Sequence, residues 1–545
     1  MSEDLGRLKK KIISAFKLSG FQIRQDVVNY FVEQLVPFND NERQKWVTQI
    51  TQKIQNQKLD SVNIEQKHIE KAINELNNAG LDEGENVFSV ISAFDVPKFV
   101  FNTQNKKFER QTQPRKILAK PTLKAGYLRN RYAMLLQKTQ RHELFSPSII
   151  EKTEEVKKFK LLFVENLLSN SSVKEAVILG LLTQLTEGKF YIEDPTGSVP
   201  LDLSSAKFHS GFFCEGSFVL AEGSFDEGIF KVAGLGFPPA EAATSSRAFF
   251  GTQNSWGGTA NKLQKYSQKL QQIEQSNTEA TIVFLSDVRL DLPIVLEKLR
   301  LLFVGYDDCP PVAIVLMGPF SVVDKNPYTM KNLLTQLGAL TNGCNQLKKE
   351  TDIVIVPSSD DPASPNILPR KGIPECLAEG LKKHYPRTIL ATNPCRLQYC
   401  TQQILVFKMD LLSKFCRNTL HFPDTQNIDY HFARTLICQG TLTPIHPIAI
   451  PIHWDFDDCL SLYPLPDLVV IGDTSQSFHT TQRGCTILNT GSFIKSNFSF
   501  KVYVPSTKTI EDSEIPEDET MIGTNDVNMS SKLLKTVNDT AMLEG

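Results

Sequence analysis

Four short runs of apolar, mostly β-branched residues in the second half of the chain constrain the fold most. They lie at residues 281–286, 312–317, 352–357 and 467–472. The segments between them have helical periodicity. Strands that are apolar throughout and joined by helical crossovers are typical of a buried sheet in a layered α/β fold. Two later runs, CTILNT (485–490) and FSFKVYV (498–504), indicate a second sheet. We expect residues 276–506 to form an α/β sandwich.

The loops after these runs are where a metal-dependent phosphoesterase would hold its ligands. That chemistry uses two metals roughly 3.5–4 Å apart, held by Asp, His and Asn side chains. Asp287 follows the first run, but Arg289 stands where a histidine is expected. Pro319, which has no ligand atom, replaces the bridging carboxylate after the second run.

The two later loops also lack histidines. Ser359 and Asp360 replace an Asn-His pair, and Asp361 follows them. Asp473 and Ser475 occupy a loop where two imidazoles are expected. At these vestigial positions we predict that the carboxylates form structural salt bridges. We expect Arg289, a fixed cation, to compete with a metal for Asp287.

The alternative of a working enzyme stays open at this point. Mg²⁺ and Mn²⁺ accept all-oxygen ligand sets, so Asp287 and Asp361 could still serve a metal-dependent phosphoesterase or nuclease. No nucleophile elbow, phosphate-binding loop or HExxH helix occurs in the chain. His446 and His453 lie near Asp455 and Asp457, but their spacing favours surface or core histidines over ligands.

Residues 146–250 carry an all-β pattern, strongest over 173–236. Strand-like runs flank the turn Asp194-Pro195-Thr196-Gly197, and a further hairpin follows. The pattern predicts a five-stranded barrel of the OB type. Such barrels often bind single strands through aromatic side chains on a basic face. Because these strands are rich in Asp and Glu, we favour a structural or protein-binding role and keep nucleic-acid binding as the alternative.

The first 145 residues divide into two parts. Residues 1–77 carry short amphipathic helical patterns and predict a helical docking domain. Residues 78–145 read as a linker with a basic segment at 105–141 that runs into a helix. A solvated linker is the first interpretation, and contact with DNA phosphates or an acidic partner is the second. The residues named for that contact are Arg115, Lys116, Lys120, Lys124, Arg129 and Arg131.

Bulk composition bounds the class of protein. The formal net charge of −2 argues against a surface built wholly to grip nucleic acid. There are 10 Cys without any CxxC pair, so we expect free thiols and no zinc site. The N-terminus has no apolar signal-peptide core, and no apolar run approaches the ~20 residues of a membrane helix. We therefore expect an intracellular protein without a cofactor, and a disordered acidic and polar tail at 507–545.

Several stretches carry a resemblance to a known family. They are SAFKLSGF (14–21), ISAFDVPKFVFN (91–102), RHELF (141–145), EGKFYIEDPTG (187–197), LDLSSAKFHSG (201–211), FLSDVRLD (284–291), TNPCRLQYC (392–400), YPLPDLVVI (463–471) and GSFIKSNFSFKV (491–502). With the order of the segments, they make the chain similar to the B-subunit family of the eukaryotic replicative DNA polymerases, and to its epsilon branch in particular. The resemblance covers about residues 5–505.

The resemblance implies a non-catalytic scaffold subunit in the nucleus. Family members hold the C-terminal zinc-binding region of the catalytic subunit through an OB barrel and a calcineurin-like phosphoesterase domain without metal ligands. The N-terminal module, similar to the small helical domain of AAA+ ATPases, implies docking to the GINS part of the CMG helicase. Histone-fold accessory subunits are expected in the same complex, with DNA contacted weakly or indirectly and no membrane.

Overall fold

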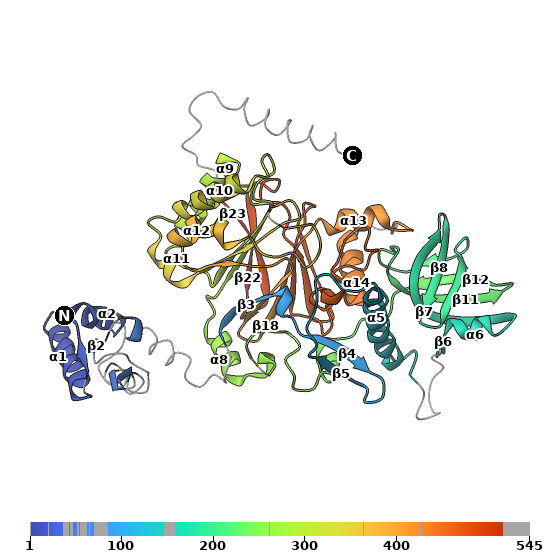
Figure 1. Cartoon of the computed structure of the whole chain (residues 1–545), viewed down its shortest axis with the longest axis horizontal. Coiled ribbons are helices and arrows are strands. Elements are labelled where there is room, and N and C mark those ends of the chain that lie inside the picture. The colour runs from blue at the N-terminus through green and yellow to red at the C-terminus, as the bar shows by residue number, and fades with distance from the viewer. Residues whose placement is uncertain are drawn as a thin grey trace, which may run out of the picture.

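The structure is a computed structural model, and it describes most of the chain. The described residues are 2–19, 21–35, 43, 47–48, 50–51, 54, 63–64, 66–69, 86–146, 158–260, 262–362, 364–423 and 427–515. They form an N-terminal helical module, a β-barrel and a two-sheet sandwich (Figure 1). The predicted multi-domain α/β architecture is confirmed at this level. Within the described residues, no helix is both long and apolar enough to cross a membrane.

In the described part of the N-terminal module, two amphipathic helices pack around a small apolar core. These are α1 (Ser2–Leu18) and α2 (Gln25–Leu35), and the short strands β1 (Gln22–Ile23) and β2 (Asn63–Ile64) pair in parallel. Phe16 and Phe31 are fully buried, with ring centroids 6.3 Å apart. The sequence predicts breaks in the helical pattern at Ser19-Gly20, at Pro37 and at 59–61, and the first is confirmed because α1 ends at Leu18. The breaks expected at Pro37 and at 59–61 lie outside the described residues.

The middle of the chain forms a closed barrel, as predicted. Its strands are β6 (Leu161–Leu162), β7 (Ser172–Thr186), β8 (Lys189–Asp194), β9 (Gly197–Asp202), β10 (Lys207–Phe208), β11 (Phe218–Asp226) and β12 (Ile229–Gly236), with helix α6 (Val164–Leu168) beside them. Antiparallel pairs join β9, β8, β7, β11 and β12 in that order, and a parallel pair between β12 and β9 closes the ring. Asp194 forms the predicted turn by accepting hydrogen bonds from the N–H groups of Thr196 and Gly197.

The sandwich consists of two six-stranded sheets. The first has the order β16-β15-β14-β13-β22-β23 and the second β20-β21-β19-β18-β17-β3. The bounds of the first are β16 (Thr388–Leu390), β15 (Asp352–Val356), β14 (Ala313–Met317), β13 (Ile282–Ser286), β22 (Ser499–Val504) and β23 (Thr509–Glu514). Those of the second are β20 (Phe478–Gln482), β21 (Cys485–Asn489), β19 (Leu468–Gly472), β18 (Gln402–Lys408), β17 (Cys395–Tyr399) and β3 (Phe88–Ser92). All four apolar runs that the sequence singled out are strands of these sheets.

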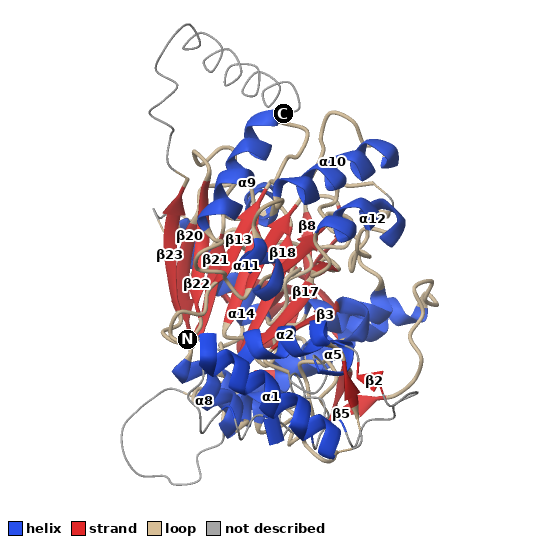
Figure 2. Cartoon of the chain, turned by 90° about the vertical axis from the view of Figure 1, so that its left-hand side faces the viewer, coloured by secondary structure: helices blue, strands red, loops and turns tan. Residues whose placement is uncertain are grey.

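Helices cover both outer faces of the sandwich (Figure 1), and Figure 2 is viewed from the side of α9–α12. The first sheet is covered by α9 (Pro293–Gly305), α10 (Pro327–Leu340), α11 (Asn345–Glu350) and α12 (Glu375–His384). The second is covered by α13 (Leu411–Asn418), α14 (Ile428–Gln439) and the 3₁₀ segment η3 (Trp454–Leu460). The remaining short elements are α7 (Ala243–Arg247), η2 (Gln264–Tyr266) and α8 (Gln268–Ser276). One apolar cluster fills the space between the sheets and one lies under each helical layer.

The segment predicted as a linker belongs to the folded body instead. Its first strand, β3, pairs with β17 as the edge of the second sheet, in register from Phe88↔Tyr399 to Ser92↔Cys395. The 3₁₀ turn η1 (Ala93–Asp95), a hairpin of β4 (Lys98–Asn102) and β5 (Lys107–Gln111), and helix α5 (Thr122–Arg141) follow. The predicted linker was wrong for residues 86–111, because charged residues alternate here with buried aromatic ones such as Phe108. The helix into which the basic segment was predicted to run is confirmed as α5.

The disordered tail expected over 507–545 was wrong for its first residues. Residues 509–514 form β23, an edge strand that pairs with β22 throughout its length. Backbone hydrogen bonds hold the strand although its sequence, TIEDSE, is polar, and Lys501 Nζ lies 2.5 Å from Asp512 Oδ1. Charged residues are common on exposed edge strands because they discourage further strand pairing. Residues 516–545 lie outside the described residues.

The barrel and the sandwich are joined by direct contacts. The segment from Gly211 to Phe218 lies against α14, where the backbone N–H of Phe212 donates to Thr435 Oγ1 at 2.9 Å. The side chain of Gln439 exchanges two hydrogen bonds with the backbone of Phe218, at 2.9 and 2.6 Å. Because all of these partners are buried, the barrel is fixed to the helical layer of the second sheet.

Candidate functional site

The loops that carry the predicted metal positions lie together at one edge of the sandwich. A Cβ atom on Gly472, at the end of β19, would lie 2.7 Å from Ser286 Oγ and 2.9 Å from Met317 Sδ. Only glycine therefore fits where β19 crosses the ends of β13 and β14. Parallel strands present their carboxyl ends at one edge of a sheet, which is where open α/β folds place their sites.

A buried ion pair occupies the centre of this edge. Lys408, the last residue of β18, places its Nζ 2.7 Å from Asp287 Oδ1, and the two side chains are only 5% and 7% exposed. A second carboxylate, that of Asp410, lies 3.9 Å from the same nitrogen. Burial lowers the pKa of Lys408, but the charges of Asp287 and Asp410 more than compensate, so that the pKa is raised. Lys408 therefore stays positively charged and pairs with the carboxylates of Asp287 and Asp410.

The predicted competition of Arg289 for Asp287 was wrong. The Arg289 guanidinium turns to Asp291, with Nε 3.4 Å from Oδ1. Asp291 in turn accepts a hydrogen bond from the backbone N–H of Val322 at 3.0 Å. The cation that neutralises Asp287 comes from the other sheet, because packing of the two sheets brings the end of β18 over the end of β13.

Asp361 is held by backbone donors. Its Oδ1 accepts from Phe320 N–H at 2.8 Å and its Oδ2 from Ser358 N–H at 2.7 Å. Burial raises the pKa of Asp361, and those hydrogen bonds together with Arg370 partly offset the rise. A Cβ on Gly318 would meet Asp361 Oδ2 at 2.1 Å, so glycine is required there.

The neighbouring predicted positions face elsewhere. Asp360 forms an exposed ion pair with Lys325 at 2.9 Å, and Ser359 accepts a hydrogen bond from Arg370 through its carbonyl oxygen. Pro319 lies in the loop between Gly318 and Phe320 and offers no ligand atom. None of these side chains contributes to a shared centre with Asp287.

Asp473 caps a helix. Its Oδ2 accepts from the N–H of Leu412, in the first turn of α13, at 2.8 Å, and its Oδ1 accepts from the N–H of Ser475 at 2.9 Å. The Ser475 hydroxyl accepts from the side-chain amide of Asn489. A carboxylate at a helix N-terminus satisfies free N–H groups and interacts favourably with the helix dipole.

These residues do not fit a catalytic metal pair. Lys408 Nζ lies against Asp287, and the oxygens of Asp361 and Asp473 each accept a backbone hydrogen bond. Among the residues that the structure describes, no group of three or more His, Cys, Asp or Glu side chains is arranged to hold a metal. His453 instead places Nδ1 3.2 Å from the carbonyl oxygen of Ile117.

Sequence reasoning missed Lys408, although a signal was present. The segment QQILVFK (402–408) is an apolar strand that ends in a lysine, as FLSD (284–287) ends in an aspartate. Opposite charges at the ends of two buried strands are a hint of an ion pair, since an isolated buried charge is strongly disfavoured. The pairing partner itself lies 121 positions away and only the fold identifies it.

The basic segment separates into exposed and buried residues. Lys116, Lys120, Lys124 and Arg129 are exposed. Arg115 is partly buried, donates to the Phe94 carbonyl oxygen at 2.6 Å and lies 4.7 Å from the centre of the Phe456 ring. The exposed residues lie on the extended segment before α5 and on the first half of α5.

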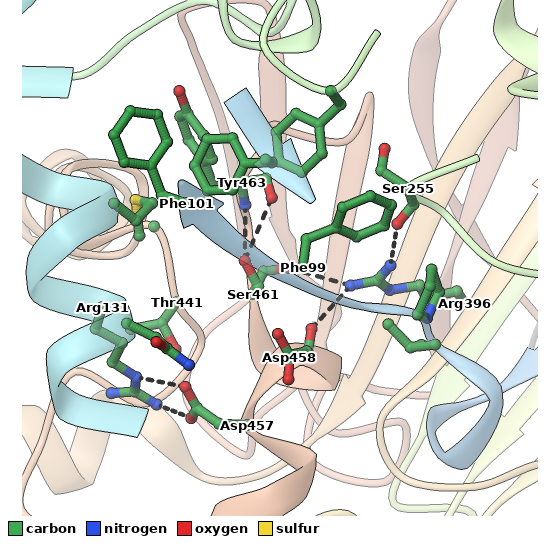
Figure 3. A pocket seen from close by; sticks show the side chains of 17 residues that line it. Phe99, Phe101, Arg131, Ser255, Arg396, Thr441, Asp457, Asp458, Ser461 and Tyr463 are labelled. Atoms are coloured by element: carbon green, nitrogen blue, oxygen red, sulfur yellow. Dashed lines mark hydrogen bonds and ion pairs between the residues drawn. The ribbon is translucent and has the colours of Figure 1, made fainter. Parts of the chain in front are cut away.

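Arg131 is buried and conflicts with the expectation that it contacts DNA or a partner. It is 7% exposed, and its Nε donates to Asp457 Oδ2 at 2.9 Å while Nη2 donates to Asp457 Oδ1. Its Nη1 donates to the Thr443 carbonyl oxygen at 3.0 Å. The residue joins α5 to η3, as Figure 3 shows.

The pocket of Figure 3 lies between α5, the β4–β5 hairpin and η3. Besides the Arg131–Asp457 pair it holds Arg396, whose Nη1 donates to the Trp256 carbonyl oxygen at 2.9 Å. Desolvation lowers the pKa of Arg396 to about 10. Desolvation and the charge of Asp457 raise the pKa of Asp458 to about 7. The volume of about 70 Å³ leaves little free space, so this junction is structural.

A second buried cation on α5 yields a pH prediction. Lys138 is 3% exposed and donates to the Cys438 carbonyl oxygen at 2.8 Å. Desolvation lowers the pKa of Lys138 to about 8. Between about pH 8 and 10.5 the unfolded chain binds a proton that the folded chain lacks, so this group makes stability rise with pH in that window.

We expect the Lys138→Met variant to lose that rise, which amounts to at most about 3 kcal/mol across the window. Urea denaturation of the full chain at several pH values from 7.5 to 10 measures it. Lys124→Met, on the exposed part of the same helix, serves as the matched control and keeps the wild-type pH dependence. Parallel curves for wild type and Lys138→Met would contradict the assignment.

Three family models match the chain. The model described as DNA polymerases epsilon N terminal matches residues 4–76, and the one described as DNA polymerase epsilon subunit 2-like, OB-fold domain matches 121–239. The third, which describes the B subunit of DNA polymerases alpha and epsilon, matches 282–480. The three matched ranges correspond to the helical module, to the barrel together with α5, and to the sandwich. The match that begins at 121 agrees with the packing of α5 against the barrel and the sandwich.

Curated relatives match nearly the whole chain. DNA polymerase epsilon subunit 2 of Drosophila melanogaster is 63% identical over 95% of this chain and 100% of its own length. The human protein of the same name is 42% identical over 93% of this chain and 99% of its own. A solved archaeal phosphodiesterase aligns with 43% of this chain and 98% of its own at 11% identity and a TM-score of 0.25. The chain therefore belongs to the family of DNA polymerase epsilon subunit 2, the B subunit of that polymerase.

Proposed function

We propose that this protein is a non-catalytic scaffold subunit of the DNA polymerase epsilon complex in nuclear DNA replication. Membership of the subunit 2 family supports the place in the complex. The buried Lys408–Asp287 ion pair carries the proposal that the site is inactive. An ammonium group 2.7 Å from the carboxylate occupies the space that a metal would need, and it brings one positive charge where two divalent metals would supply four.

The scaffold role rests on two separately folded parts. The barrel and the sandwich, fixed together through α14, offer a rigid surface for the C-terminal region of the catalytic subunit. The helical module offers docking to the GINS part of the replicative helicase, and histone-fold subunits complete the complex. In this module, Ile13 on α1 is 38% exposed, which leaves apolar surface for a partner.

Co-expression tests both attachments in the full chain. The wild type is expected to co-elute with the C-terminal region of the catalytic subunit and to bind purified GINS. Ile13→Glu is expected to weaken GINS binding at least tenfold and to leave co-elution with the catalytic subunit unchanged. Ser14→Glu, an exposed neighbour with the same added charge, is the matched control. Failure of the wild type to co-elute would refute the scaffold role.

Absence of hydrolysis is a further expected result. Purified protein with Mn²⁺ should show no turnover of a phosphodiester or of single-stranded DNA above the buffer rate, because Lys408 Nζ lies 2.7 Å from the Asp287 carboxylate that a metal would need. The double variant Asp287→Ala, Asp361→Ala should give the same result. Turnover in the wild type that disappears in the double variant would establish the alternative, a metal-dependent phosphoesterase or nuclease using those two residues.

A second contact surface is supported by exposure and charge. Lys116, Lys120, Lys124 and Arg129 are exposed, and the first turn of α5 contains no acidic residue. A helix N-terminus adds a partial positive charge to its neighbouring lysines. We assign this strip to contact with an acidic partner surface or with DNA phosphates in the complex. Reversal of Lys120 and Lys124 to glutamate should weaken that contact and reduce its salt dependence.

A further inference from the structure

One face of the barrel opens into a long groove. Two cavities of about 570 and 580 Å³ share the lining residues Phe159, Val177 and Glu222 and therefore lie next to each other. Strands β7, β11 and β12 form the floor, the segment 158–162 forms one wall, and α14 with the β20–β21 turn forms the other. We call this space the barrel groove.

Charge is distributed unevenly around the barrel. The barrel groove is lined by six cationic side chains, those of Lys158, Lys160, Lys174, Lys231, Arg434 and Arg483, and by the acidic side chains of Glu175 and Glu222. The acids that gave the barrel strands their negative composition, among them Glu187, Asp194, Asp202 and Glu227, line neither cavity. The acidic composition of the strands, which favoured a structural or protein-binding role, therefore does not describe this face of the barrel.

Arg434 adds a donor that the protein does not satisfy. This arginine lies on α14 and lines the groove, and its Nε is buried without a hydrogen-bond partner among the described residues. Buried polar groups in native proteins are nearly always hydrogen-bonded. The guanidinium itself lines the groove, and its planar set of donors suits phosphate oxygens in particular.

Aromatic rings stand among these cations. Phe145 and Phe159 lie with their centroids 6.1 Å apart, and Tyr430 is 40% exposed on α14. All three line the same cavity as Arg434. Rings at the surface of a basic groove are the features on which single-stranded nucleic acids stack their bases.

The floor of the groove is open at one glycine, Gly234. Val177, Glu222 and Gly234 lie directly opposite one another on three neighbouring strands. A Cβ on Gly234 would meet no atom closer than 3.9 Å, so the glycine leaves space that a larger side chain would fill. Gly234 lies beside a β-bulge, but its φ is outside the left-handed region, so a side chain can be introduced there as a blocking substitution.

We propose that the barrel groove binds single-stranded nucleic acid, with the phosphodiester backbone along the cations and bases against the rings. A duplex keeps its bases stacked and cannot use the rings. An acidic peptide would complement the cationic side chains, but it has no bases to stack on the aromatic rings. The inference does not depend on the scaffold role, since the groove is formed by the barrel and the sandwich of this chain alone.

Fluorescence anisotropy with labelled oligo(dT) and the full-length protein tests the proposal. The Lys160→Glu, Lys174→Glu double variant is expected to weaken binding at least tenfold. It should also lower the log–log salt slope by roughly 0.7 for each phosphate that is no longer neutralised. The Lys189→Glu, Lys349→Glu double variant changes the same charge at exposed positions outside the groove and should bind like the wild type.

A blocking variant separates the groove from general electrostatics. Gly234→Leu leaves the charge unchanged and fills the floor, so it is expected to weaken oligo(dT) binding at least fivefold at unchanged thermal stability. Equal loss in both charge-reversal variants, or full binding by Gly234→Leu, would overturn the proposal. Equal affinity for duplex DNA, or stronger competition by polyglutamate than by oligo(dT), would also overturn it and would assign the groove to another partner.

Discussion

Replacing Lys408 with methionine is expected to lower the free energy of unfolding by about 3–5 kcal/mol. The substitution keeps the volume of the side chain but leaves Asp287 buried without its cation, 2.7 Å from where Nζ had been. Asp410 and Asp473 lie close enough to Lys408 to influence its pKa and would lose the same charge. Urea denaturation of the full chain, followed by the fluorescence of the sandwich tryptophans, measures the change.

Two variants show whether burial produces the effect. Lys325→Met removes one partner of an exposed Lys–Asp pair of similar length, 2.9 Å, whose side chains are more than half exposed. Its loss should change stability by about 1 kcal/mol or less. The double variant Asp287→Leu, Lys408→Met should recover part of the stability, since apolar side chains often replace a buried pair without loss. Recovery stays partial because Asp287 has a φ of 58°, which leucine adopts at a cost, and because Asp410 still lacks its cation. A loss below about 1 kcal/mol in Lys408→Met would contradict the assigned role.

Arg131→Met is expected to be destabilising by about 3–5 kcal/mol as well. It removes a two-point ion pair with Asp457 and the hydrogen bond to the Thr443 carbonyl oxygen, all at a nearly buried position. Burial lowers the pKa of Arg131, but Asp457 more than compensates, so that the pKa is raised and the guanidinium remains charged. Because α5 joins the barrel to the sandwich, limited proteolysis should also detect faster cleavage near this helix.

Arg129→Met provides the matched control on the same helix. Arg129 is exposed, so the change should stay within about 0.5 kcal/mol. Arg131→Lys tests geometry separately, because an ammonium cannot reproduce the two-point contact with Asp457. We expect it to recover only part of the stability. Identical stability of the Arg129→Met and Arg131→Met variants would show that the pair does not anchor α5.

The elements that could be predicted from sequence are those whose pattern is local. The four apolar runs, the barrel strands around Asp194 and the helix ending at Leu18 were all found, because burial of a whole strand or of one helix face is visible in residue order. Strand β3 and strand β23 were missed. Their residues alternate or carry charge, and pairing with a distant strand determines their structure.

The candidate site divides in the same way. Asp287, Asp361 and Asp473 were located from sequence because each follows a recognisable strand. Their partners were not located, since Lys408, the backbone N–H groups around Asp361 and the first turn of α13 reach them only through the fold. Arg131 was taken for a surface residue because it belongs to a run of clustered lysines and arginines, whereas one face of the helix is buried against η3.

The sequence by itself determined the order of the domains, the strands of the sandwich, the missing histidines of the metal loops and the family. It could do so because these properties depend on residue type and on spacing within a few turns or strands. The tertiary structure alone decided which charges meet. It paired Lys408 with Asp287, buried Arg131, and collected lysines and arginines from several elements in one groove on an otherwise acidic barrel. Electrostatic interactions depend on distance and burial, and neither is fixed until the chain has folded.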